Sequence, residues 1–249
     1  MVIKTPREID LIRTASQVVA ETLQMLRMHV TEGVTTRELD VLAENYVRKA
    51  GCLPAFKGYQ GYPATLCTSV NDQIVHGIPS DYVLKNGDLL SIDMGAIYKG
   101  YYGDSATTVL VGEVSDKHRL LTQVTEAALY KGIEMATAGN RLGDISHAIQ
   151  IHAEHFGFSV VREFVGHGIG SHLHEDPQVP NYGPAGQGPL LPEGLVLAIE
   201  PMVNEFSPGV RTLADRWTAV TVDGGFSAHF EHTVLITGNG PEILTRIAD

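Results

Sequence analysis

Two stretches with helical periodicity open the chain. Residues 5–8 read Thr-Pro-Arg-Glu, a capping box with proline at the first helical position, and apolar residues then recur at helical spacing to residue 26. Residues 35–38, Thr-Thr-Arg-Glu, repeat the capping signal ahead of a second apolar stripe, and Gly51 is a suitable C-terminal stop. The pattern predicts two consecutive N-terminal helices.

The pattern then changes to short β-rich runs. Residues 88–97 and 101–111 form two such runs, with the dipeptide Lys99-Gly100 between them. Two strands joined by two residues, one of them glycine, are typical of a β-hairpin. Helical patterning returns later, and strands separated by Gly/Pro-rich loops follow to the C-terminus. The second pair of helices is predicted at about residues 116–138 and 144–156.

The order helices, strands, helices, strands suggests an internal duplication, with halves at about residues 1–112 and 113–249. Residues 87–93 (GDLLSID) resemble residues 194–200 (GLVLAIE), and each segment places glycine six residues before a carboxylate. We therefore expect a single α+β domain built from two similar halves. Each half would bring one carboxylate-bearing strand to a shared centre.

Composition narrows the class of protein. A chain of 249 residues with 43% hydrophobic residues can bury a large core. A net charge of -11 argues against nucleic-acid or anionic-membrane partners, which need basic surface. The two cysteines, Cys52 and Cys67, make no disulfide framework, and residues 1–10 lack the apolar segment of a signal peptide. No apolar run reaches the roughly 18 residues of a membrane helix. A cytoplasmic protein is expected.

The hairpin carries two aspartates whose relation follows from the turn. If Lys99 and Gly100 form a two-residue turn, residue 95 lies opposite 104 and residue 93 lies opposite 106. Because side chains alternate along a strand, Asp93 and Asp104 then share one face as diagonal neighbours. Two such carboxylates repel each other unless a cation lies between them. For the pair alone, simple exposure to solvent is the alternative.

Three further residues favour a metal site over exposure. Glu200 ends an apolar strand, Glu231 lies in the apolar run 230–236, and His167 lies in the glycine-rich segment 166–170. Carboxylates in apolar runs are seldom free of partners. Four carboxylates would neutralise two divalent cations, and oxygen ligands with one nitrogen suit manganese, iron, cobalt or zinc. Two such ions can activate water for hydrolysis, and a spare position could hold an α-amino group, as in an exopeptidase.

At these residues the chain resembles the methionine aminopeptidases of the pita-bread metallopeptidases. The matching segments cover nearly the whole chain in family order: residues 69–72 (SVND), 76–79 (HGIP), 92–93 (ID), 103–105 (GDS), 166–170 (GHGIG), 199–201 (IEP) and 230–233 (FEHT). The resemblance implies a pita-bread fold, with two pseudo-symmetric halves around a central antiparallel sheet and helices outside. It also implies that two metals are held by Asp93, Asp104, His167, Glu200 and Glu231.

The resemblance further implies a role for each of these groups. Asp104 and Glu231 would bridge the metals, Asp93 would chelate one, and His167 and Glu200 would complete the other. Glu200 would also carry a proton from the attacking water to the leaving amine. His76 and His174 would orient the scissile amide and stabilise charge on its oxygen, although His174 could equally be a metal ligand or a solvated residue by its own context. The family's methionine pocket corresponds to Tyr59, Tyr62, Cys67, Leu173 and Trp217, for which an ordinary aromatic core is the alternative.

Two positions depart from the family pattern. Leu173 stands where many relatives carry phenylalanine, and His229 stands where glutamine is often found. Both departures bear on specificity and leave the reaction type unaffected. The implied substrates are peptides and nascent chains with N-terminal methionine and a small second residue. A monomer is expected, and a transient contact with the ribosome stays open.

Three other functions compete with this one. The first is a proline-directed peptidase of the same pita-bread group, which shares the five ligands. The second is a metal-free relative that only binds peptides or ribosomes, although a retired site has no reason to keep its carboxylates together. The third is a structural protein whose acidic groups are all solvated. Metal content and chelator sensitivity separate these possibilities.

Overall fold

The computed structural model describes residues 1–247. Within these residues, four α-helices and a short 3-10 helix at Tyr59–Gly61 accompany the strands. The helices are α1 (Pro6–His29), α2 (Thr36–Lys49), α3 (Asp116–Met135) and α4 (Leu142–His155). The strands are β1 (Leu53–Pro54), β2 (Cys67–Val70), β3 (Gln73–Val75), β4 (Leu89–Tyr98), β5 (Tyr101–Leu110), β6 (Ser159–Val160), β7 (Gly166–Gly168), β8 (Glu175–Val179), β9 (Val196–Ile199), β10 (Met202–Asn204), β11 (Val210–Thr212), β12 (Ala219–Thr221), β13 (Ser227–His229), β14 (Glu231–Thr237) and β15 (Gly240–Ile243).

Both N-terminal helices begin where the capping signals predict. Thr5 caps α1 and Thr35 caps α2, and each threonine forms a complete capping box with the glutamate three residues later. Glu8 and Glu38 each accept a backbone N–H bond from the capping threonine, which holds the pKa of both carboxyls below the usual range. These local bonds fix the two helix starts without help from tertiary contacts.

The second helix pair differs from its predicted bounds by a few residues. Helix α3 ends at Met135 instead of residue 138, because the chain leaves the helix at Ala136. Helix α4 begins at Leu142 instead of residue 144, with Arg141 at the N-cap position. Asp144 accepts a bond from the Arg141 backbone N–H, so it is the third residue of the helix and not its start.

A nine-stranded sheet contains strands from both the N-terminal and the C-terminal part of the chain. Its main path runs β1-β4-β5-β14-β9-β7-β8, with β2 on β4 and β15 on β14, and all of these pairs are antiparallel. Two three-stranded sheets, β13-β10-β6 and β11-β12-β3, lie beside it. The predicted α+β class with a central antiparallel sheet is therefore confirmed.

The hairpin of β4 and β5 has the predicted register. Lys99 and Gly100 form the two-residue turn, with φ of 48° and 84°, as the twist of a type I′ turn requires. Gly95 lies opposite Asp104, and Asp93 lies opposite Ala106. The two aspartates are thus diagonal neighbours on one face, as the alternation of side chains requires.

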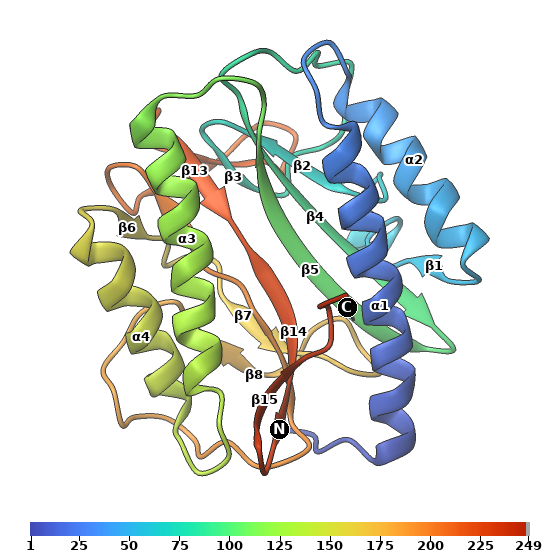
Figure 1. The fold of residues 1–249 in the computed structure, drawn as a ribbon, viewed down its shortest axis with the longest axis vertical. Helices are drawn as coiled ribbons and strands as arrows, with labels where there is room; N and C mark the ends of the chain where they lie inside the picture. Colours follow the sequence, from blue (N-terminus) through green and yellow to red (C-terminus); the bar gives the residue numbers. More distant parts are fainter. Residues whose placement is uncertain (248–249) are drawn as a thin grey trace.

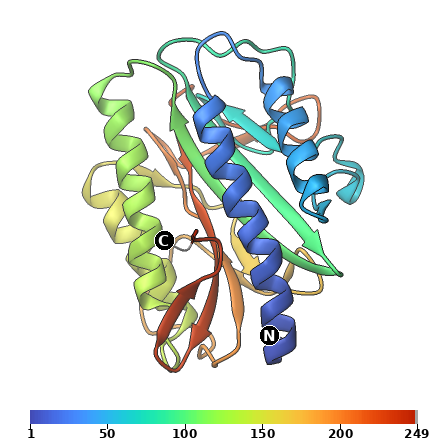
Figure 2. The same cartoon turned by 45° about the vertical axis from the view of Figure 1, so that its right-hand side comes forward.

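The helices pack in two pairs on one face of this sheet. In Figure 1, α1 and α2 lie on one side and α3 and α4 on the other, with β5 and β14 running between α1 and α3, and Figure 2 shows the same arrangement after rotation. Helix α1 lies so close to β5 that a Cβ on Gly103 would be 2.6 Å from the backbone nitrogen of Ser16. Because Asp104 follows Gly103, its side chain points away from the helices.

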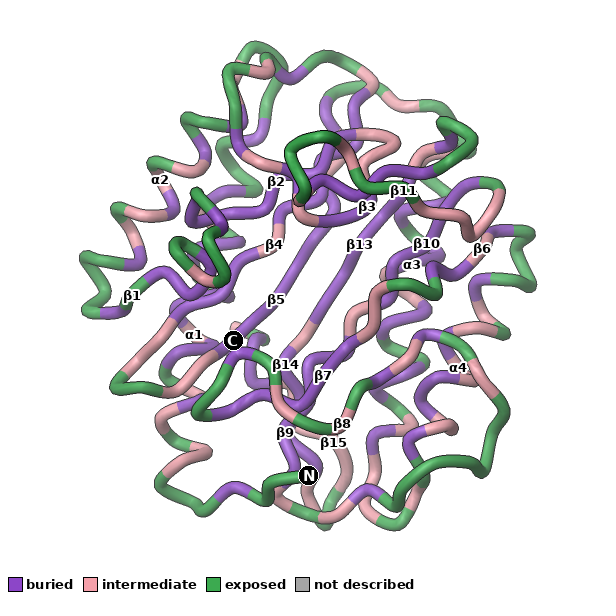
Figure 3. Tube along the Cα trace, turned by 180° about the vertical axis from the view of Figure 1, so that it is seen from behind, coloured by how far each residue is buried: buried purple, intermediate pink, exposed green. Residues whose placement is uncertain are grey.

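The core fills the space between these layers. From behind, the long central strands are buried along most of their length (Figure 3). Gly87 and Gly194 each lie two residues before a buried strand with positive φ, 96° and 81°, so the two similar segments enter β4 and β9 alike. The division of the chain near residue 112 stays a prediction. Within residues 1–247, no helix combines the length and the apolar character needed to span a membrane.

Candidate metal centre

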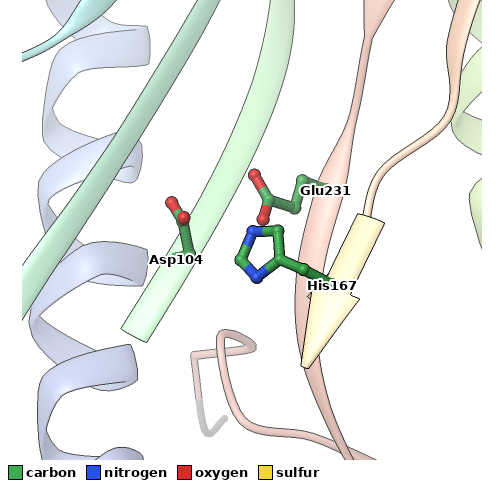
Figure 4. Close-up of side chains that lie close together, drawn as sticks. All are labelled: Asp104, His167 and Glu231. Atoms are coloured by element: carbon green, nitrogen blue, oxygen red, sulfur yellow. The ribbon is translucent and has the colours of Figure 1, made fainter. Parts of the chain in front are cut away.

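Three predicted ligands converge on the face of the sheet opposite α1. Asp104, His167 and Glu231 each offer a ligand atom, and these atoms lie within 4.8 Å of one another. Figure 4 shows the three side chains directed toward one another from β5, β7 and β14. All three are buried, with relative exposures of 4%, 7% and 2%. Such a group is a candidate site for a cation.

The pairing of β5 with β14 fixes two of these side chains. Glu231 pairs with Ala106 and His232 with Ser105, so Glu231 and Asp104 are diagonal neighbours on the same face of the two strands. The hydroxyl of Thr233 accepts the Asp104 backbone N–H at 3.0 Å and donates to the Asp104 carbonyl at 2.7 Å. Strands β5 and β14 belong to different parts of the chain, so Asp104 and Glu231 come together only because these strands pair.

His167 has one ring nitrogen free to act as a ligand. Its Nδ1 lies 2.9 Å from the carbonyl oxygen of Gly168, a bond that fixes the proton on Nδ1. The lone pair of Nε2 is then directed toward the carboxylates, and Nε2 lies 3.5 Å from Glu200 Oε1. This is the orientation that metal-binding histidines usually have.

Asp93 and Glu200 complete the set of five. Asp93 shares its face of the β4–β5 hairpin with Asp104, and Glu200 immediately follows β9, next to His167. The structure thus brings all five predicted ligands around one centre. Their coordination of a metal stays a prediction.

The carboxylates are electrostatically incompatible without a cation. Burial raises the pKa of Glu200 to about 8 and, together with the charge of Glu200, that of Asp93 to about 7. Burial and the neighbouring carboxylates raise the pKa of Asp104 and Glu231 well above the usual range. Four adjacent negative charges in one enclosed place need compensating positive charge. No lysine or arginine pairs with any of the four among the ion pairs of the described residues.

Unpaired oxygen atoms point to the same conclusion. Asp93 Oδ1, Asp104 Oδ1 and Glu231 Oε1 are buried and have no hydrogen-bond partner within the described part of the chain. Buried carboxylate oxygens without partners are costly, and metal coordination is one way to satisfy them. The residues present therefore fit a pair of divalent ions in charge, donor type and unused bonding capacity.

A cavity with about 680 Å³ of empty space, partly open to solvent, lies over the centre. Every residue of the predicted site lines this cavity: Tyr59, Tyr62, Cys67, His76, Asp93, Asp104, His167, Leu173, His174, Glu200, Trp217 and Glu231. Tyr62 packs edge-on against Trp217 with ring centroids 5.0 Å apart. Cys67 pairs with Asp93 between β2 and β4, and burial raises the pKa of its thiol. The predicted pocket residues thus form one wall next to the carboxylates.

The two predicted catalytic histidines flank this cavity. His76 follows β3 with φ of 61°, a left-handed conformation, and its ring meets Phe164 edge-on at 5.2 Å. Burial is the main cause that lowers the pKa of His76, to about 4. His174 lies just before β8, and its Nδ1 is 2.7 Å from the hydroxyl of Tyr59. Burial also lowers the pKa of His174. Both rings are therefore neutral at physiological pH and can donate N–H bonds.

The loop that carries His174 is anchored by the N-terminal segment. Lys4 forms an ion pair with Glu175, and their side chains are only 2% and 9% exposed. The Lys4 backbone N–H also donates to the Gly194 carbonyl at 2.8 Å. A residue ahead of α1 therefore holds the residue that directly follows His174.

Sequence reasoning left some residues of this site without a role. Phe56 and Gln60 line the cavity, and both belong to a segment with little periodicity. His229 is 1% exposed, and its Nε2 lies 3.7 Å from Glu200 Oε2. Its position two residues before Glu231 was a signal that it lies near the centre, but its orientation depends on tertiary packing.

Comparison with known proteins agrees with this geometry. The model of "Metallopeptidase family M24" matches residues 10–238. The chain is 55% identical over 247 residues to methionine aminopeptidase 1 of Bacillus subtilis, covering 99% of this chain and 100% of the relative. It is 53% identical to the methionine aminopeptidase of Clostridium perfringens, covering 99% of both chains.

Solved structures give the same result for the fold. The crystal structure of methionine aminopeptidase from Thermotoga maritima superposes with a TM-score of 0.98 at 49% identity, covering 99% of this chain and 100% of that chain. Prolidase from Pyrococcus furiosus superposes with a TM-score of 0.79 at 26% identity, and the match spans 66% of that chain. The pita-bread fold predicted from the resemblance is confirmed. With a family model over most of its length and relatives above half identity, this chain belongs to metallopeptidase family M24.

Proposed function

We propose that this chain is a two-metal aminopeptidase that removes N-terminal methionine from peptides and nascent chains with a small second residue. The observation that carries the proposal is the convergence of five ligand side chains under a cavity with an aromatic and sulfur-lined wall. The names of the relatives that share about half its sequence support the choice of methionine.

Two divalent ions, manganese, iron, cobalt or zinc, would be held by Asp93, Asp104, His167, Glu200 and Glu231. The ligand atoms of Asp104, His167 and Glu231 lie within 4.8 Å of one another, which supports this assignment. When bound, the ions supply a water of lowered pKa and polarise the scissile carbonyl. All remaining roles belong to side chains of this chain.

Glu200 is assigned the proton transfer. Its carboxylate lies at the edge of the cavity beside His167, with 14% of its side chain exposed. It takes a proton from the attacking water and passes it to the leaving amine, a transfer that needs a carboxylate within hydrogen-bond reach of both groups.

His76 and His174 are assigned to the substrate carbonyl. A neutral imidazole that donates an N–H bond to this oxygen stabilises the negative charge that develops on it during attack. Tyr59 accepts or donates at His174 Nδ1, which directs the other nitrogen of that ring away from Tyr59. Substituting either histidine by alanine is expected to lower kcat by about 10²–10³-fold with metal content unchanged. Loss of metal in these variants would refute the assignment.

The methionine side chain is assigned to the wall formed by Tyr59, Tyr62, Cys67, Leu173 and Trp217. A thioether gains from aromatic and sulfur neighbours, and Leu173 and Tyr62 are almost fully buried. A large second residue would crowd the space over the carboxylates, so Met-Ala peptides should be cleaved faster than Met-Phe peptides. Equal rates would contradict this part of the proposal.

The proposal is tested by methionine release from Met-Ala-Ser. The chelated protein is supplied separately with manganese, iron, cobalt or zinc, and peptides beginning with leucine or carrying Xaa-Pro serve as controls. Metal-restored release confined to the methionine peptide is expected. Cleavage of Xaa-Pro instead would favour the proline-directed activity suggested by the prolidase-like fold. No release with any metal would leave the peptide-binding alternative.

The physiological setting is part of the same proposal. We assign the enzyme to the cytoplasm as a monomer that contacts the ribosome transiently, because nascent chains first expose their N-terminal methionine there. Both cysteines are free thiols, which suits a reducing compartment. Sedimentation of the purified protein alone and with ribosomes tests the oligomeric state and the contact.

A further inference from the structure

His229 is held rigidly beside the metal centre. It ends β13, pairs with Met202 of β10, and is 1% exposed. Its backbone N–H donates to the hydroxyl of Thr108 at 2.9 Å, and the same hydroxyl donates to its carbonyl at 2.9 Å. Ser91 completes this chain of bonds at 2.8 Å from Thr108. The backbone of His229 is therefore fixed to β5, the strand that carries Asp104.

The ring of His229 faces Glu200. Its Nε2 lies 3.7 Å from Glu200 Oε2, while Glu200 Oε1 lies 3.5 Å from His167 Nε2. The carboxylate of Glu200 therefore lies between two imidazoles, one on each oxygen. His167 is bonded through Nδ1 to a backbone carbonyl, so its Nε2 offers a lone pair and not a proton. Only His229 can supply a donor to Glu200 from this pair.

The ring nitrogen of His229 has an unused bonding capacity. Nε2 is buried without a hydrogen-bond partner in the described residues. An unsatisfied buried donor is costly, so a partner is expected in the working protein. Glu200 Oε2 is close enough that a shift of less than about 1 Å produces a normal N–H···O distance.

We propose that His229 is a positioning residue for Glu200, with Nε2–H donating to Oε2. This bond would fix the rotation of the carboxylate, so that Oε1 faces the centre beside His167. The inference deepens the proposed function and rests on its assignment of Glu200 as ligand and proton carrier. Metal-bound carboxylates commonly have such hydrogen-bonded partners, and these partners affect both metal affinity and activity.

Substitutions at this position can separate hydrogen bonding from packing. Glutamine and histidine share one property that matters at this distance, a side-chain N–H donor. Leucine has a similar volume but no donor, and asparagine has a donor on a shorter side chain. The variants His229→Gln, His229→Leu and His229→Asn therefore separate the donor from the packing.

A matched control is available on the adjacent strand. His232 lies one residue beyond Glu231, but its ring contacts Thr245 at 2.8 Å and Tyr130 at 3.4 Å. It faces away from the carboxylates, because alternate residues of β14 point to opposite faces. His232→Leu should lower thermal stability and leave manganese affinity unchanged.

The test is calorimetric titration of the chelated full-length protein with manganese, followed by kcat and KM on Met-Ala-Ser. His229→Leu is expected to weaken binding of one of two manganese ions about 10–100-fold and to lower kcat, with little change in KM. His229→Gln should remain within about threefold of the parent protein in both measurements. If the leucine variant does not fold, His229→Asn takes its place, with the same expected losses.

The outcomes separate this inference from the function on which it rests. Unchanged manganese affinity and kcat in His229→Leu, with normal metal binding by the parent protein, overturns the role of His229 alone. Equal losses in the glutamine and leucine variants also overturn it, since the imidazole would then act otherwise than as a donor. A parent protein that binds no manganese overturns both the proposed function and this inference.

Discussion

Breaking the ion pair of Lys4 with Glu175 is expected to destabilise the protein far more than most single substitutions. In Lys4→Met the ammonium is lost, but Glu175 stays enclosed with 9% of its side chain exposed. Its remaining donors are weaker, the His172 backbone N–H at 3.2 Å and the Ser171 hydroxyl at 3.5 Å. Neither bond carries a compensating charge.

The magnitude follows from the burial of both groups. Removing one partner of a buried pair costs about 3–5 kcal/mol, because it leaves an uncompensated charge away from water. For a chain of this size, that corresponds to a fall in Tm of roughly 6–20 °C. Replacing both residues by apolar ones, as in Lys4→Met with Glu175→Leu, should recover most of the loss, since desolvation of the pair then disappears.

Denaturant unfolding of the parent, both single variants and the double variant forms a complete thermodynamic cycle. The exposed pair Arg37 and Asp81, with side chains 59% and 82% exposed, is the control, and Arg37→Met should change stability very little. The single variants should also lower kcat more than they lower metal content, because Glu175 adjoins His174. A loss in Lys4→Met no larger than that in Arg37→Met would refute the reasoning.

Three further predictions concern the centre and its pocket. In the metal-free protein, burial raises the pKa of Asp93 to about 7 and that of Glu200 to about 8, above the unfolded values of about 4. The stability they contribute is therefore complete below about pH 4 and is lost as pH rises through 7 to 8. Buried histidines with lowered pKa, such as His76, oppose this loss below about pH 6.5 but not above it. The Tm of chelated protein should therefore fall from pH 7 to 9 and recover with manganese; a Tm that rises over this range would contradict the assigned shifts. Asp104→Asn should bind fewer than two ions, measured by metal analysis, and lose more activity than the roughly 10–100-fold typical of outer-sphere changes; full occupancy would show that Asp104 is not a ligand. Trp217→Ala removes the edge contact with Tyr62 at 5.0 Å and should raise KM for methionine peptides with metal binding intact, and an unchanged KM would exclude Trp217 from the pocket.

Local periodicity was sufficient to predict the parts of the site that lie within one hairpin. The turn at Lys99 and Gly100 set the register, and alternation then placed Asp93 and Asp104 on one face. The capping boxes at Thr5 and Thr35 defined helix starts for the same reason, because each depends on residues three positions apart. Helix α4 was predicted two residues late, because Arg141 at its N-cap is not a residue type that marks a helix start.

Contacts between distant segments could not be derived from periodicity. The meeting of β5 with β14 and of β9 with β7 brings His167, Glu200 and Glu231 to the aspartates, and only the family resemblance had grouped them. The orientation of His229 and the pairing of Lys4 with Glu175 join positions far apart in sequence or depend on side-chain packing. Both contacts depend on the tertiary structure, so no local sequence pattern predicts them.

The pairing of β5 with β14 makes formation of the centre depend on association of two separate parts of the chain. Of the five predicted ligands, Asp93 and Asp104 precede residue 112 and the other three follow it; β5 and β14 pair through Glu231 with Ala106 and His232 with Ser105. Two separately expressed fragments divided at residue 112 would each lack a complete set of ligands. Recovery of metal-dependent cleavage on mixing would then report association of the fragments, which makes the chain a candidate for split-enzyme complementation.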